Sequence, residues 1–170
     1  MNVKLLLVDE NMEAVEKLQA AFADDPALSA RNLEPSEIPT MQELDALYLT
    51  FPAAERWNPR LLFYESQVFK TRPDGAWPPH IVTGILMDPS DPRASDRKAE
   101  LELSIKAVLN AVNSYNKENK FPIKTVGFWT RDLGINRMDA SSAGEIIKSV
   151  WEDTLSEFKQ QHAEPRLPTL

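Results

Sequence analysis

The sequence predicts an α/β fold, a three-layer α/β/α sandwich built around a mixed, mostly parallel sheet. Two continuous apolar runs, residues 3–8 and 123–129, are typical of strands that are buried on both faces of a parallel sheet. Each run is bordered by an amphipathic helical pattern. Between them, residues 64–70 and 80–87 form a strand pair across a turn-forming segment, which predicts a hairpin. Strand–helix alternation at both ends of the chain with a hairpin between them favours helices on both faces of one sheet.

The first half of the chain begins with the strand 3–8, and Asn11 is placed to cap a helix. Apolar residues then recur at helical spacing up to Pro26, as Met12, Val15, Leu18 and Phe22. Residues 28–33 predict a short strand, and residues 44–51 predict a third strand that Pro52 closes.

The second half begins with the hairpin, whose turn is Arg72-Pro73-Asp74-Gly75. After a polar loop, a long helix is predicted from the spacing of Leu101, Ile105, Val108, Leu109 and Val112, with its end near Glu118. The strand 123–129 follows. Ser142 and Glu145 have the spacing of a capping box, which predicts the start of the final helix. We expect residues 3–8, 45–51, 81–87 and 123–129 to lie in one sheet.

The length of 170 residues suits a single domain, because domains cluster near ~100–150 residues. We assign residues 1–160 to that domain and expect residues 161–170 to be a flexible tail. No segment approaches the ~20 apolar residues of a membrane span, so no membrane partner is expected. The opening apolar run is too short for a signal-peptide core.

Charge and cysteine content exclude several classes of site. The chain has no cysteine, which rules out disulfides, thiol catalysis and cysteine-bound metals. Its two histidines are His80 and His162, and we predict no metal site and no cofactor. The net charge of −7 argues against a nucleic-acid partner, because phosphate binding needs clustered cations. An acidic, cysteine-free chain is expected to be cytoplasmic.

The segment Val8-Asp9-Glu10-Asn11 resembles the opening of response-regulator receivers, in which acidic residues after the first strand hold magnesium. A receiver also needs a phosphoacceptor aspartate after its third strand, and here that strand ends in Thr50-Phe51-Pro52. Asp88 follows an apolar strand too late in the chain. We therefore expect Asp9 to brace the strand–helix junction.

A second resemblance covers roughly residues 3–158. The opening strand, acidic turn and helix resemble those of a group of bacterial macro domains. Leu44-Asp45-Ala46-Leu47-Tyr48 is similar to the family's Asp-Ala-Ile-Val strand, and His80-Ile81-Val82-Thr83-Gly84-Ile85-Leu86 resembles its central strands. Ile123-Lys124-Thr125-Val126-Gly127-Phe128 looks like the strand before its phosphate loop.

This resemblance implies a pocket at the carboxyl ends of the parallel strands that binds ADP-ribose or a related nucleotide, and some members of the family hydrolyse ADP-ribose linkages. The implied ligand-binding residues lie in two loops. They are Thr50, Phe51, Pro52, Trp129, Thr130, Arg131, Asp132, Leu133, Gly134, Ile135 and Asn136. The sequence assigns no catalytic residue.

Both loops depart from the family pattern. Pro52 stands about where the family has an asparagine, and no glycine precedes Gly75. The second loop keeps Gly134 but carries Asp132, while Arg131 and Arg137 offer cations for a phosphate. Two hypotheses follow. The chain binds ADP-ribose or a related nucleotide, or it is a macro-like module that has lost nucleotide binding and acts through a protein partner.

Overall fold

The structure of this protein is a computed structural model that describes residues 2–72 and 76–163. Within these residues, the strands are β1 (Lys4–Asp9), β2 (Leu28–Asn32), β3 (Ala46–Leu49), β4 (Val68–Lys70), β5 (His80–Thr83) and β6 (Thr125–Trp129). The α-helices are α1 (Met12–Ala21), α2 (Arg97–Glu118) and α3 (Ala140–Ala163). Short 3-10 helices are η1 (Pro35–Thr40), η2 (Pro52–Trp57), η3 (Pro92–Ser95), η4 (Thr130–Leu133) and η5 (Ile135–Arg137).

The described strands form one sheet in the order β2-β1-β6-β3-β5-β4. Neighbouring strands are parallel from β2 to β5, and β4 pairs antiparallel with β5, with Phe69 opposite Ile81. The two apolar runs of the sequence, β1 and β6, lie side by side in the sheet interior, with Leu5 opposite Val126. The predicted α/β class with a mixed, mostly parallel sheet is confirmed.

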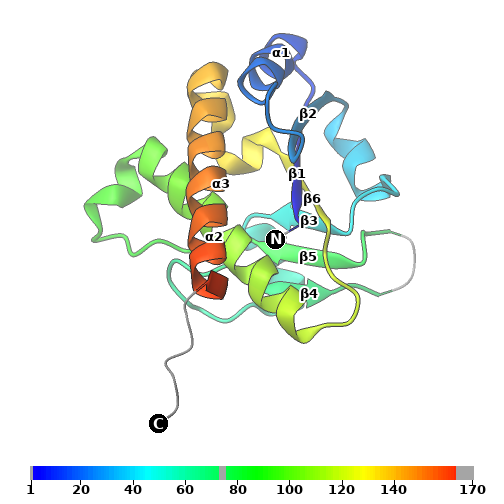
Figure 1. The fold of residues 1–170 in the computed structure, drawn as a ribbon. Coiled ribbons are helices and arrows are strands. Elements are labelled where there is room, and N and C mark those ends of the chain that lie inside the picture. The colour runs from blue at the N-terminus through cyan, green and yellow to red at the C-terminus, as the bar shows by residue number, and fades with distance from the viewer. Residues whose placement is uncertain (1, 73–75, 164–170) are drawn as a thin grey trace.

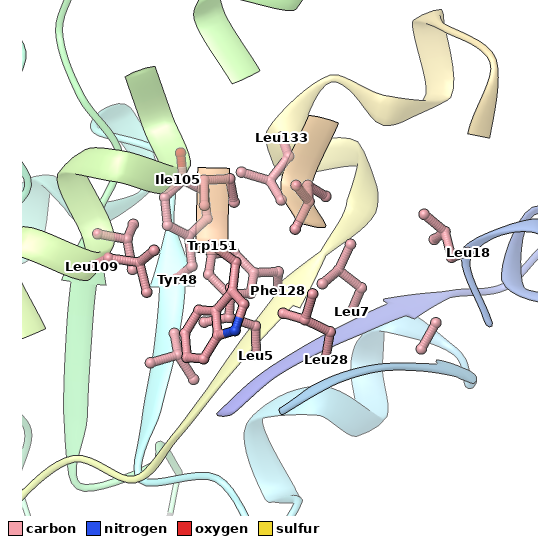
Figure 2. Close-up of a cluster of buried hydrophobic side chains, with 14 of the residues drawn as sticks. Leu5, Leu7, Leu18, Leu28, Tyr48, Ile105, Leu109, Phe128, Leu133 and Trp151 are labelled. Atoms are coloured by element: carbon pink, nitrogen blue, oxygen red, sulfur yellow. The ribbon is translucent and has the colours of Figure 1, made fainter. Parts of the chain in front are cut away.

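One face of the sheet carries all three α-helices (Figure 1). α3 lies between α1 and α2 and packs against both. Its buried Trp151 belongs to the same apolar cluster as Leu5 and Phe128 of β1 and β6 (Figure 2). This cluster is the main core of the protein, because it joins residues from every α-helix to both central strands.

The opposite face is covered by shorter elements. Leu6, Val8, Leu47 and Ile81 point to this side, and Ile38 of η1 packs on them. Partly buried aromatic side chains, Trp57, Trp77 and Trp129, complete this second cluster. The sandwich therefore has three layers of unequal size, with α-helices on one face and 3-10 helices and loops on the other.

The final helix begins differently from the prediction. α3 starts at Ala140, and the Asp139 side chain accepts hydrogen bonds from the Ser142 backbone N–H at 3.0 Å and the Ser142 hydroxyl at 3.1 Å. The predicted capping box of Ser142 and Glu145 is therefore wrong, because Asp139 caps the helix earlier in the chain. The helix extends through Ala163. The rest of the predicted tail, residues 164–170, and the turn residues 73–75 lie outside the described residues.

Other local predictions are confirmed. Asn11 caps α1 by accepting a hydrogen bond from the Ala14 N–H, and α2 ends at Glu118. Gly144 lies where α3 approaches α1 closely, since a Cβ built on it would stand 2.6 Å from the Cβ of Ala21. A larger residue at this position would therefore force the two helices apart.

Candidate functional site

The carboxyl ends of four parallel strands, β1, β6, β3 and β5, meet along one edge of the sheet. α1, α3 and α2 follow β1, β6 and β5 onto the same face, whereas η2 follows β3 toward the opposite face, where Trp57 packs. The chain thus leaves β3 in a different direction from both neighbouring strands. Ligand sites of open α/β sheets lie at such points, so this edge is the first place to search for a site.

The loop between β6 and α3 lies at this edge. It consists of η4 and η5, joined at Gly134, whose φ of 74° lies in the left-handed region. Most residues with a Cβ avoid this region, which explains why a glycine is used here. A Cβ built on Gly134 would meet nothing within 4 Å, so the surface above this glycine is open.

Asp9 fastens this loop to the end of β1. One oxygen of its carboxylate accepts a hydrogen bond from the Thr130 hydroxyl at 2.6 Å, and the other accepts one from the Asn11 backbone N–H at 2.8 Å. Asp9 is 8% exposed and Thr130 is 1% exposed. Through Asn11 the Asp9 carboxylate braces the junction of β1 and α1, as the sequence predicts, and through Thr130 it also joins this junction to the loop after β6.

Arg131 lies on the same side of the loop as β1. Its guanidinium is 4.0 Å from the Glu10 carboxylate and 5.2 Å from the centre of the Trp129 ring. The Trp129 indole N–H donates to Glu10 at 3.1 Å. A hydrogen bond from its own backbone lowers the pKa of Glu10, with further contributions from the Trp129 indole and the Arg131 charge. The Glu10 carboxylate therefore partly neutralises the charge of Arg131.

Asp132, the next residue of the loop, is half-buried. Burial raises the pKa of its carboxyl to about 6. Among the residues that the structure describes, its side chain forms no hydrogen bond or ion pair. A carboxylate with these properties at the end of a parallel strand can accept hydrogen bonds from a ligand and can take up a proton near neutral pH.

The charge of this carboxylate affects the pKa of Tyr48 in β3. Burial raises the pKa of the Tyr48 hydroxyl, a hydrogen bond with Ser104 lowers it, and the charges of Asp132 and Glu100 raise it further. The hydroxyl also lies next to Gly84, where a Cβ would stand 2.7 Å from the Tyr48 oxygen. The Tyr48 hydroxyl therefore lies near Gly84 at the end of β5, and the charge of Asp132 reaches it from the loop after β6.

Two cavities flank the loop after β6. The first has a volume of about 370 Å³, lies between the loop and the start of α1, and contains Arg131, Ile135 and Asn136 in its wall. The second, of about 230 Å³, lies between the loop and the start of α2. Its wall includes Leu133 and Gly134 from the loop and Arg97 from α2.

The predicted ligand-binding residues therefore do not line one common cavity. Thr50, Phe51 and Pro52 line neither of these two cavities. The Thr50 hydroxyl accepts a long hydrogen bond from the Ala53 N–H at 3.4 Å, so it helps to begin η2. Trp129 packs against the core of the opposite face, and Thr130 is used by Asp9.

The second cavity contains two cations, one of which sequence reasoning does not assign to the site. The guanidinium of Arg97 donates to the backbone oxygen of Arg137 at 2.5 Å, and the Arg137 side chain lines the same cavity. Within residues 2–72 and 76–161, neither guanidinium forms an ion pair. Arg97 lies 40 positions before Arg137 in the chain, and only the fold brings them together.

Comparisons with protein-family models, with curated protein sequences and with solved structures found no match. The macro-domain resemblance therefore rests on the residues quoted above. No described helix is long and apolar enough to cross a membrane. In the described part of the chain, no three His, Asp or Glu side chains gather in a way that suits a metal ion.

Proposed function

We infer that this protein is a macro-like module that binds ADP-ribose or a related nucleotide at the carboxyl edge of its sheet. The observation that carries this inference is the cavity beside Gly134, in which Arg97 and Arg137 provide two cations that form no ion pair within the described part of the chain. Glu100 also lines the cavity, which leaves a net charge of +1 in its wall. Arginine pairs of this kind bind phosphate oxygens through charge-assisted hydrogen bonds.

The surroundings of Gly134 suit the phosphate end of such a ligand. The open space above this glycine lets a phosphate oxygen approach the backbone, which a side chain would prevent. Glu10 lies 4.0 Å from Arg131 and partly neutralises its charge, so Arg97 and Arg137 are the cations that we assign to the phosphate. A cavity of about 230 Å³ holds only part of a dinucleotide, and the rest of the ligand would extend along the strand ends.

Asp132 suits the ribose end. Its unpaired, half-buried carboxylate can accept hydrogen bonds from two neighbouring hydroxyl groups, as acidic residues at strand ends do in dinucleotide-binding folds. The same charge disfavours a phosphate at that position. The ligand is therefore expected to lie with its sugar toward Asp132 and its phosphate toward Gly134 and Arg137.

Calorimetry with ADP-ribose tests this function directly. We expect a micromolar dissociation constant, which corresponds to about −8 kcal/mol. Arg137→Gln is expected to weaken binding by roughly 1.5–3 kcal/mol, the usual scale of a charged hydrogen bond. Lys159→Gln, an exposed position on α3, is the matched control with the same change in net charge and no expected effect.

Two results would contradict the proposal. One is the absence of measurable heat with millimolar ADP-ribose at the protein concentrations of the experiment. The other is binding that Arg137→Gln and Lys159→Gln weaken equally, which would place the ligand away from the cavity beside Gly134.

A second candidate function, binding to a protein partner, is favoured by three consecutive exposed apolar residues, Leu61, Leu62 and Phe63. Leu61 is 83% exposed and Phe63 is 53% exposed. The segment is held in place, because the Gln67 side chain accepts from the Arg60 N–H at 2.8 Å and donates to its oxygen at 2.9 Å. An ordered, exposed apolar run of this kind is typical of a contact surface.

A photo-crosslinking amino acid at position 61 tests this second function. In cells that express the labelled full chain, we expect a discrete protein adduct with the label in place of Leu61. The same label in place of Lys159 should give no such adduct. If both positions give the same adducts or neither gives any, the segment is not a contact surface and the second function fails.

A further inference from the structure

We propose that the protein has a second ligand site at the opposite, amino-terminal edge of the sheet, which binds a small organic anion with an aromatic or aliphatic body. The site is a cavity of about 660 Å³ between the paired ends of β4 and β5 and the segment that follows α2. Figure 1 shows that this edge is far from the loop between β6 and α3. The site is thus separate in space from the proposed nucleotide site, with which it shares no lining residue in the described part of the chain.

The walls of this cavity are aromatic and come from separate parts of the chain. Trp77 precedes β5, Tyr115 lies in the last turn of α2, and Phe121 follows that helix. Phe121 is 78% exposed, an unusually large fraction for a side chain of this type. Three aromatic surfaces around one space can enclose a flat or apolar group.

The floor of the cavity is His80, the first residue of β5. Its Nδ1 lies 3.2 Å from the Asp45 backbone oxygen, and its Nε2 lies 2.8 Å from the Tyr115 hydroxyl. A backbone oxygen only accepts, so Nδ1 carries the proton and Nε2 accepts from Tyr115. Burial lowers the pKa of His80, opposed by its contact with the Asp45 backbone, and nearby Lys70 lowers it further. Burial therefore favours the neutral form of the His80 ring at the floor.

The rim of the cavity is positively charged. Lys70 ends β4, Arg72 follows it, and Lys120 lies after α2. Among the residues that the structure describes, none that lines the cavity is acidic, although the whole chain has a net charge of −7. Within the described residues, none of these three cations forms an ion pair. A charged rim around an apolar interior fits a ligand whose body enters the cavity and whose anionic group stays at the rim.

The dimensions agree with a ligand of this class. Small-molecule sites commonly have volumes of ~300–1,000 Å³, mostly apolar walls and a few polar groups that fix the orientation of the ligand. Here the polar groups that fix orientation are the cations of the rim. The charge pattern therefore favours an anion over a neutral molecule of the same shape.

The fluorescent anion 8-anilinonaphthalene-1-sulfonate is a suitable probe, because it joins an aromatic body to one negative charge. We expect saturable binding to the native chain with a micromolar dissociation constant. N-phenyl-1-naphthylamine has the same aromatic body without the sulfonate, and we expect it to bind at least about tenfold more weakly, the loss of one charged contact.

Variants locate the probe. The double variant Lys70→Gln/Lys120→Gln is expected to weaken sulfonate binding about tenfold or more, and Phe121→Ala, at an exposed position, several-fold. Lys98→Gln/Lys159→Gln changes the net charge equally at exposed positions outside the cavity and should have no effect. Equal losses in both double variants, or equal affinity for the charged and neutral probes, would overturn the proposal.

Competition identifies the anionic group. Phenyl phosphate, benzoate and phenol are added separately to the protein with the bound sulfonate probe. Displacement by phenyl phosphate or by benzoate, but not by phenol, supports the site and shows which anion it prefers. Failure of both anions to displace the probe, or equal displacement by phenol, would show that the cavity does not select organic anions.

Discussion

Replacing Asp132 by asparagine is expected to make the protein more stable at pH 7.5, by about 1–2 kcal/mol. Burial raises the pKa of this carboxyl to about 6, above the value of ~3.9 in an unfolded chain. Between these pH values the folded state binds more protons than the unfolded state, so stability falls as the pH rises through this range. An asparagine side chain has no charge to bury, so the variant avoids this loss. The full pKa shift would correspond to ~3 kcal/mol. The expected effect is smaller, because solvent screens the charge of a half-buried side chain.

Urea unfolding between pH 3.5 and pH 8 tests this prediction. The stability difference between Asp132→Asn and the unchanged protein should be near zero at about pH 4 and reach its full value above about pH 6.5. Asp153→Asn, at an exposed position of α3, removes the same charge and should show no such rise. If Asp132→Asn is destabilising at pH 7.5, the carboxylate contributes to folding and is not held ready for a ligand.

A residue that lowers stability in this way is a candidate for a role in binding or catalysis. Side chains that cost stability at a strand end are kept where binding or catalysis uses them. The expected gain from Asp132→Asn therefore complements the calorimetry with ADP-ribose. Together, the two measurements separate a carboxylate that serves a ligand from one that is only poorly placed.

The strands and helices of this protein could be predicted because their signals are local. β1 and β6 are continuous apolar runs, which indicates burial on both faces. The predicted hairpin of residues 64–70 and 80–87 is present as the antiparallel pair β4 and β5, but these strands are shorter than predicted. The capping-box pattern places the start of α3 too late, because two residues, Asp139 and Ser142, are both able to cap a helix. Only the tertiary position of the preceding loop decides between them.

The geometry of the candidate site could not be predicted from the sequence. The charges of the loop after β6 are visible in the sequence, but the pairing of Arg131 with Glu10 and the burial of Asp132 depend on neighbouring elements. Arg97 begins α2, and no local signal in the sequence places it beside Arg137. The cavity at the other edge could not be predicted from the sequence either, because only the folded sheet brings Trp77 and Phe121 to the same space.

Asp9→Ala and Thr130→Val are each expected to lower the free energy of unfolding by about 2–3 kcal/mol. Asp9→Ala leaves the buried Thr130 hydroxyl and the Asn11 N–H without their acceptor. Thr130→Val keeps the shape of the side chain and removes the hydroxyl donor from a carboxylate that is itself buried. Both changes leave a buried polar group unsatisfied, which costs ~1–3 kcal/mol and more for a charged group.

Thermal and urea unfolding of the two single variants and the double variant measure how much of this loss is shared. Since both changes remove the same hydrogen bond, the double variant should lose less than the sum of the single losses. Thr40→Val, which removes an exposed hydroxyl, is the control. Millimolar magnesium should leave stability unchanged, because both Asp9 oxygens already accept hydrogen bonds. A rise with magnesium that Asp9→Ala abolishes would instead make Asp9 a metal ligand, and additive losses would show that the brace between β1 and the loop after β6 does not act as one unit.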